Sequence, residues 1–103
     1  MPDGLSEACK EKLRQIERGL LRVVSTGSSR ACFELLDDIV IATQEADNDC
    51  RELLRTIERE LQNAIEKYHV DDDLVDHSLP EQFLAEIRKV QSSVYRYSLR
   101  KAV

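Results

Sequence analysis

The chain has few of the residues on which many small folds depend. Its 103 residues include three glycines, two prolines and no tryptophan, and aromatic residues make up only 5%. The scarcity of glycine and proline disfavours a fold of many short strands joined by tight turns. Because aromatic side chains are few, Leu, Ile, Val and Ala must fill the hydrophobic core. A chain of this length can bury one such core, so we expect a single domain over residues 1–103.

The sequence also lacks a long apolar run. Its most apolar stretch, residues 39–42, is far shorter than the roughly 18 residues needed to span a bilayer. The first residues contain no apolar signal-peptide core. We therefore expect no membrane association and a cytoplasmic or nuclear location.

Cysteine is scarce as well. Cys9, Cys32 and Cys50 lie far apart, and their odd number is unlike the disulfide framework of a secreted domain. They also lack the close pairing of structural zinc sites. All three lie at apolar or boundary positions of expected helices, so we predict free thiols that pack as small hydrophobic side chains.

The chain also lacks an excess of basic over acidic residues. The chain has 15 Lys and Arg against 20 Asp and Glu, which gives a net charge of −5. A domain that grips phosphates is usually net basic, so this balance disfavours nucleic acid as a partner. With 42% hydrophobic and 34% charged residues, the composition is that of a globular domain with a heavily charged surface.

Helical periodicity is what the sequence does contain. Apolar residues recur at steps of three and four in four segments, about 6–24, 29–46, 50–69 and 79–99. Each segment is therefore predicted to be an amphipathic helix. Because the connections are short, successive helices should be antiparallel. The predicted fold is an all-α, compact, up-down-like four-helix bundle.

Capping residues mark several helix ends. Ser6 can cap the first helix, and Gly27 can take the left-handed conformation that ends it. The spacing of Ser78 and Glu81 resembles a capping box and predicts the start of the last helix.

The boundary between the second and third helices is open to two interpretations. Residues 46–49 are polar and favour a turn, and Asp49 with Glu52 resembles a capping box. No glycine or proline intervenes, so a single long helix is the alternative. We favour the turn.

The two histidines limit the possible chemistry. His69 forms one Glu-x-x-His pattern with Glu66, whereas di-iron bundles carry two. The acidic segment between His69 and His77 lacks the glycine and distal glutamate of an EF-hand, so we interpret it as a solvated linker in which Leu74 and Val75 touch the core. The sequence contains no Gly-rich phosphate loop and no Gly-x-Ser-x-Gly motif. We expect no enzymatic activity, no metal, no cofactor and no small-molecule substrate.

The second segment is apolar on more than one side. Besides its main stripe, it carries a second stripe formed by Phe33, Leu36 and Val40. A helix with two apolar sides is buried on both, so it is either central in a monomer or meets another chain. If the second stripe is left exposed, Phe33, Leu36 and Val40 form a partner-binding patch with Phe33 as its anchor.

The leading hypothesis is a non-enzymatic helical protein–protein interaction module, that is, an adaptor, a regulatory subunit or a dimerisation domain of a larger assembly. Its partner would be another protein or a second copy of the chain. The alternative is a nucleic-acid-associated helical domain that uses the basic C-terminal helix. There Lys89, Arg96 and Arg100 share a face close to Tyr95.

Overall fold

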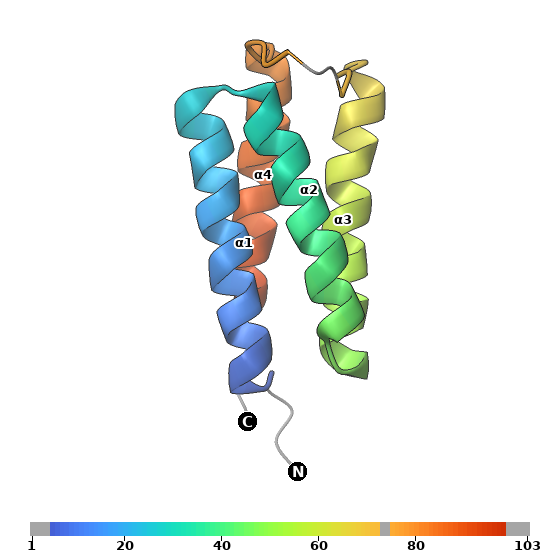
Figure 1. Cartoon of the computed structure of the whole chain (residues 1–103). Helices are drawn as coiled ribbons and strands as arrows, with labels where there is room; N and C mark the ends of the chain where they lie inside the picture. Colours follow the sequence, from blue (N-terminus) through green and yellow to red (C-terminus); the bar gives the residue numbers. More distant parts are fainter. Residues whose placement is uncertain (1–4, 73–74, 99–103) are drawn as a thin grey trace.

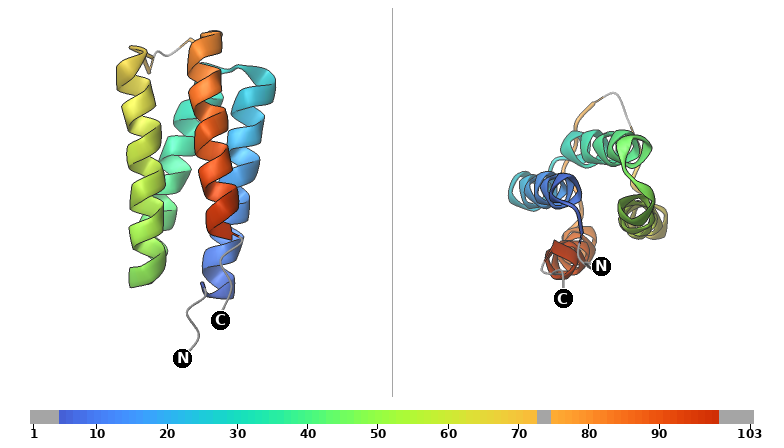
Figure 2. Two further views of the ribbon diagram at one scale, coloured as in Figure 1. Left: turned by 180° about the vertical axis from the view of Figure 1, so that it is seen from behind. Right: turned by 90° about the horizontal axis from the view of Figure 1, so that it is seen from below.

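Four helices form the computed structural model, which describes residues 5–72 and 75–98. They are α1 (Glu7–Thr26), α2 (Ser29–Glu45), α3 (Asn48–Lys67) and α4 (Glu81–Ser98). Successive helices run in opposite directions (Figure 1). Each helix packs against its neighbours in sequence, and α4 returns against α1, so the four form a ring in end view (Figure 2). The predicted all-α four-helix bundle is confirmed, with every helix end within two residues of its predicted position.

One apolar core fills the centre of the ring. Each helix contributes a buried stripe of residues three or four positions apart, as its helical period requires. The largest fully buried side chains are Leu13, Leu20, Ile39, Leu54, Ile57, Leu61, Phe83 and Ile87. Burying each side chain of this size contributes about 1.5–3 kcal/mol. The bundle is therefore held mainly by aliphatic packing.

The predicted caps around α1 are confirmed. The Ser6 hydroxyl accepts a hydrogen bond from the Cys9 N–H, which satisfies a free donor of the first turn. Gly27 ends α1 in the left-handed conformation, with φ of 64°. Ser28 then caps α2 by accepting from the Ala31 N–H.

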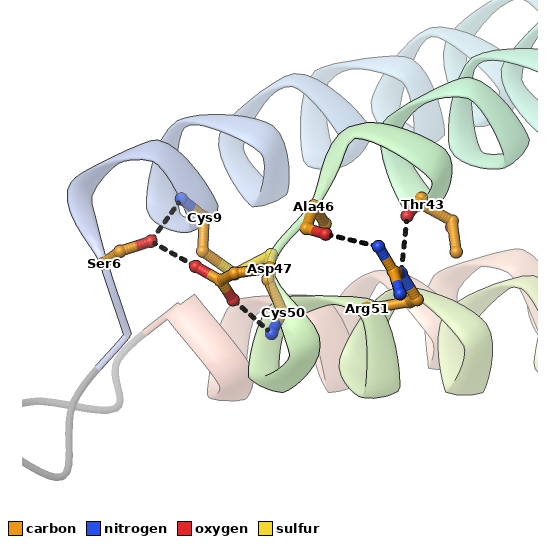
Figure 3. Close-up of a disulfide and its surroundings, with 7 residues drawn as sticks. All are labelled: Ser6, Cys9, Thr43, Ala46, Asp47, Cys50 and Arg51. Carbon is orange, nitrogen blue, oxygen red and sulfur yellow. Dashed lines mark hydrogen bonds between the residues drawn. A yellow bond between two sulfur atoms is a disulfide. The ribbon is translucent and has the colours of Figure 1, made fainter.

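Helices α2 and α3 are separate, as we predicted. Ala46 and Asp47 connect them, and the Asp47 carboxylate caps α3 by accepting from the Cys50 N–H at 3.0 Å. The predicted capping box of Asp49 and Glu52 is therefore wrong by two residues, because the helix starts earlier. The Arg51 guanidinium reaches back to the end of α2 (Figure 3) and donates to two carbonyls there, of Thr43 and Ala46.

Two of the cysteines form a disulfide. Cys9 and Cys50 are joined with a Cα–Cα distance of 5.7 Å (Figure 3), so the prediction of three free thiols is wrong for this pair. Both residues are the third of their helices, and α1 and α3 start at the same end of the bundle (Figure 1). Cys32 is free and buried, as predicted. Its burial raises the pKa of the thiol to about 12, which makes it unreactive at neutral pH.

The connection before α4 differs from its predicted form. Helix α4 begins at Glu81, and the Pro80 carbonyl accepts from the Leu84 N–H, so the predicted cap at Ser78 is wrong. Ser78 instead pairs with Ser28 in an isolated antiparallel bridge. This bridge attaches the connection to the turn between α1 and α2.

The side chains of this connection that enter the core are not the ones that we predicted. Val70 and Leu79 are buried and belong to the core. Val75 was expected there but is 75% exposed, and Leu74 lies outside the described residues. The side chains next to the helix ends are buried because the ends hold them close to the core.

Candidate functional site

A groove of about 430 Å³ follows the seam between α1 and α2. Its floor is apolar and consists of Ile16, Gly19, Ala31, Leu35 and Ala42. Gly19 lies against Leu35, because a Cβ built on Gly19 would come within 2.5 Å of the Leu35 Cδ1 atom. The missing side chain lets the two helices approach closely at the middle of the groove.

The two walls of this groove carry opposite charge. Helix α1 contributes Lys12 and Arg22, and helix α2 contributes Glu34, Asp38 and Glu45. Within the described parts of the chain, no ion pair joins the two walls. The groove thus presents a basic edge and an acidic edge on either side of an apolar floor.

Ile41 is the exposed apolar side chain of this groove. It lies on the α2 side and is 53% exposed. Its neighbours at helical spacing, Asp38 and Glu45, line the same wall. A partner that covers the groove would therefore remove an isoleucine from water and meet charged side chains around it.

The predicted patch of Phe33, Leu36 and Val40 lies on the opposite edge of α2. Helical spacing puts these residues away from Ala31 and Ala42, hence on the side that packs toward α3. All three are half-buried, and Phe33 and Leu36 pack against the core. They offer less free surface than Ile41 does. Their binding of a partner stays a prediction.

A second surface spans α1 and α4 and is rich in arginine. Two depressions there share Glu17 and Gln91, and their arginines are Arg14, Arg18, Arg88 and Arg96. Leu21 and Tyr95, which are 54% and 53% exposed, lie beside them. Of the basic face predicted for the last helix, Arg96 belongs to this surface. Lys89 lies in the seam toward α3, and Arg100 is outside the described residues.

The seam between α3 and α4 is also charged, but its charges pair within the chain. Lys67 and Lys89 each place Nζ 3.5 Å from the same carboxylate oxygen of Glu86. Burial would raise the pKa of Glu86, but Lys89 and Lys67 hold that pKa below its usual value. Because these charges already have partners, this seam has less to offer a second molecule.

A serine, a histidine and an aspartate meet at the end of the bundle where α2 begins. The Ser29 hydroxyl lies 3.1 Å from His77 Nδ1 and 3.2 Å from the Asp76 carboxylate. In a catalytic triad the carboxylate orients the histidine, whereas here Asp76 bonds to Ser28, Ser29 and the Arg30 N–H. Ser29 is also buried. The cluster therefore anchors the connection before α4, and its carboxylate does not orient the histidine as the carboxylate of a triad does.

The described part of the acidic connection before α4 forms no metal centre. Among the residues that the structure describes, which leave out Asp73, no three His, Cys, Asp or Glu side chains are placed to hold a metal ion together. None of the helices, as far as they are described, is long and apolar enough to cross a membrane.

No known protein family matches this chain, and neither does any curated protein sequence or solved structure.

Proposed function

We propose that the chain is a non-enzymatic helical protein–protein interaction module whose contact surface is the α1–α2 groove. It would serve as an adaptor, a regulatory subunit or a dimerisation domain. The observation that carries the proposal is the combination of an exposed Ile41 with two oppositely charged walls that form no ion pair with each other.

This combination suits the docking of a helix. An amphipathic helix recognises a groove through apolar anchors and through charges along its rim. Ile41 supplies the anchor on this side, and the walls set the orientation of the partner more than its affinity. Phe33, Leu36 and Val40 are a second proposed contact, but Ile41 has more surface to lose to a partner.

Capture of binding proteins by the immobilised chain tests the proposal. Ile41→Glu should abolish capture, both of a second sample of the chain and of proteins from an extract. Leu21→Glu is the matched control, because Leu21 is an apolar residue with an exposure of 54% that lies on the α1–α4 surface and does not line the groove. Equal loss in both variants, or no capture by the unaltered chain, would overturn the proposal.

A nucleic-acid-associated domain is the second candidate, and the arginine-rich surface between α1 and α4 favours it. Arginine side chains bind phosphates in bidentate fashion, and the exposed Tyr95 could stack on a base. Binding of a fluorescent RNA or DNA oligonucleotide at two salt concentrations tests it. The Arg14→Gln/Arg18→Gln/Arg88→Gln variant should then lose binding and reduce its salt dependence.

The disulfide bears on the proposed cytoplasmic or nuclear location. Disulfides persist in oxidising compartments and are rare where thiols are kept reduced. In the cytoplasm the Cys9–Cys50 pair would be largely reduced, whereas in an oxidising compartment it would be fully formed. Alkylation of free thiols in intact cells, followed by mass spectrometry of both cysteines, separates these two cases.

A further inference from the structure

We propose that the α1–α2 groove binds the same groove of a second copy of this chain, in a dimer whose two-fold axis runs parallel to the bundle. The inference rests on the proposed function and names its partner. Four features carry it: the charges of the walls, the levels at which they lie, the exposed Ile41 and the size of the face.

The wall charges select this arrangement over the other face-to-face dimer. With the axis parallel to the helices, α1 of each copy lies over α2 of the other. The basic wall of Lys12 and Arg22 then meets the acidic wall of Glu34, Asp38 and Glu45, and it does so twice. An in-plane axis perpendicular to the helices would place α1 on α1 and α2 on α2. Like charges would face each other there, which is unfavourable.

The opposite charges also lie at matching levels along the bundle. Helices α1 and α2 are antiparallel and joined by a turn at Gly27 (Figure 1). Arg22 lies five residues before Gly27 and Glu34 seven residues after it, whereas Lys12 lies fifteen before and Glu45 eighteen after. At about 1.5 Å per residue, each pair differs in level by less than about 5 Å. Long side chains span such a difference, so Arg22 can meet Glu34 of the second copy, and Lys12 can meet Glu45.

The same dimer covers the exposed isoleucine. Ile41 is fourteen residues after Gly27, close in level to Gln15, which is twelve before it. It would therefore lie over α1 of the second copy, beside the apolar floor at Ile16 and Gly19. The symmetry buries two copies of Ile41 in one interface.

The face is large enough for a dimer of modest affinity. Twenty residues of helix are about 30 Å long, and two helices side by side are about 20 Å wide. The flat area of about 600 Å² per copy approaches the ~800 Å² that each partner buries in a standard interface. Because charged pairs contribute much of the contact, the association should weaken as salt is added.

Charge reversal on one wall at a time provides the test. In Lys12→Glu/Arg22→Glu both walls become acidic, and in Glu34→Lys/Asp38→Lys/Glu45→Lys both become basic. Sedimentation velocity should show a dimer for the unaltered chain and monomers for each variant, with self-association weakened at least about tenfold. An equimolar mixture of the two variants should form a heterodimer, because every wall then meets its opposite. Circular dichroism checks that both variants fold.

A second measurement needs no variant. Carbodiimide cross-linking of mixed ¹⁴N- and ¹⁵N-labelled chains should give a Lys12–Glu45 cross-link that contains one light and one heavy peptide. A monomer at all concentrations, a dimer without this cross-link, or variants that fail to pair in the mixture would each overturn the inference.

If the chain is monomeric but Ile41→Glu still abolishes capture of a different protein, only this inference fails. If no capture is found either, the proposed function fails with it.

Discussion

At the scale of single residues, His69 occupies a position that favours glycine. It has a φ of 52°, in the left-handed region where a Cβ costs about 1–2 kcal/mol. The N–H groups of His69 and Val70 donate to the carbonyls of Glu66 and Ile65, at 3.2 and 3.0 Å. This pattern is the usual helix ending with a left-handed residue. The backbone hydrogen bonds and the burial of Val70 hold His69 in an unfavourable conformation.

We therefore expect His69→Gly to stabilise the chain. The left-handed conformation costs glycine nothing, and the exposed imidazole gives up little packing. The free energy of unfolding should rise by up to about 1 kcal/mol, after allowance for the more flexible unfolded chain. Urea denaturation measures it. His69→Ala is the control, since it keeps the Cβ and should bring no gain. A loss of stability in the glycine variant would mean that the imidazole itself is needed.

Gly19 presents the opposite case, because a side chain there would meet Leu35. Alanine in a helix is about 1 kcal/mol more favourable than glycine, but its Cβ would lie 2.5 Å from the Leu35 Cδ1 atom. Overpacking of this kind costs about 1–3 kcal/mol. Gly19→Ala should therefore destabilise the chain by about 1 kcal/mol. In a Leu35→Ala background the same change should become stabilising, because the clash is gone. Thermal denaturation of the unaltered chain, the two single variants and the double variant gives the coupling, and equal effects in both backgrounds would contradict the close contact.

At the scale of elements, the connection before α4 supplies part of the cap of α2. The Asp76 carboxylate accepts hydrogen bonds from the Arg30 N–H and from the hydroxyls of Ser28 and Ser29. The backbone of Ser29 and His77 is also joined, by Ser29 N–H to the His77 carbonyl. A residue 46 positions away in sequence thus satisfies a donor at the start of α2.

This cap should depend on pH. The Arg30 N–H and the Ser28 hydroxyl hold the pKa of Asp76 below its usual value. A lowered pKa in the fold gives stability that is complete above the unfolded value of about 3.9 and is lost as the pH falls through the folded value. Asp76→Ala should therefore lower the melting temperature by a constant amount above about pH 5, and this difference should shrink in acid. Asp76→Asn keeps an acceptor but loses the charge. An unchanged difference at low pH would show that the carboxylate charge is not involved.

The elements also show which features the sequence could predict. The four helices follow from local periodicity, so Leu13, Leu54 and Ile57 are buried as their spacing requires. The caps at Ser6 and Gly27 are local too. The contacts of Asp76 with Ser28 and of Cys9 with Cys50 join residues more than 40 positions apart, which no local pattern encodes.

The candidate surface was missed for the same kind of reason. The stripe of Phe33, Leu36 and Val40 was evident in the sequence, but its partial burial depends on α3. Ile41 gave no stripe of its own, so its exposure became visible only with the helices in place. The charges of Lys12 and Glu45 are ordinary surface charges in sequence, and they form one groove only because α1 and α2 are antiparallel neighbours.

At the scale of the whole molecule, the disulfide joins helices that are opposite in the ring. Helices α1 and α3 both begin at one end of the bundle, and the Cys9–Cys50 bond links their first turns (Figures 1 and 3). The Ser6 hydroxyl also donates to the Asp47 carboxylate at this end, at 3.4 Å. Each of these helices otherwise packs mainly on α2 and α4. The bond therefore fixes α1 and α3 to each other at one end of the bundle, and it restricts the conformations of the unfolded chain.

Reduction of this bond should cost much of the stability of the bundle. The bond spans 41 positions, and closing a loop of that size removes unfolded-state entropy worth about 4 kcal/mol. The oxidised chain should therefore unfold at higher denaturant concentration than the chain in dithiothreitol, by up to this free energy. The variant Cys9→Ser/Cys50→Ser should behave like the reduced chain and should not respond to dithiothreitol. Because Cys32 is buried and unreactive, it should add no response of its own. Equal stability of the oxidised and reduced chains would mean that aliphatic packing alone fixes α1 and α3 at this end.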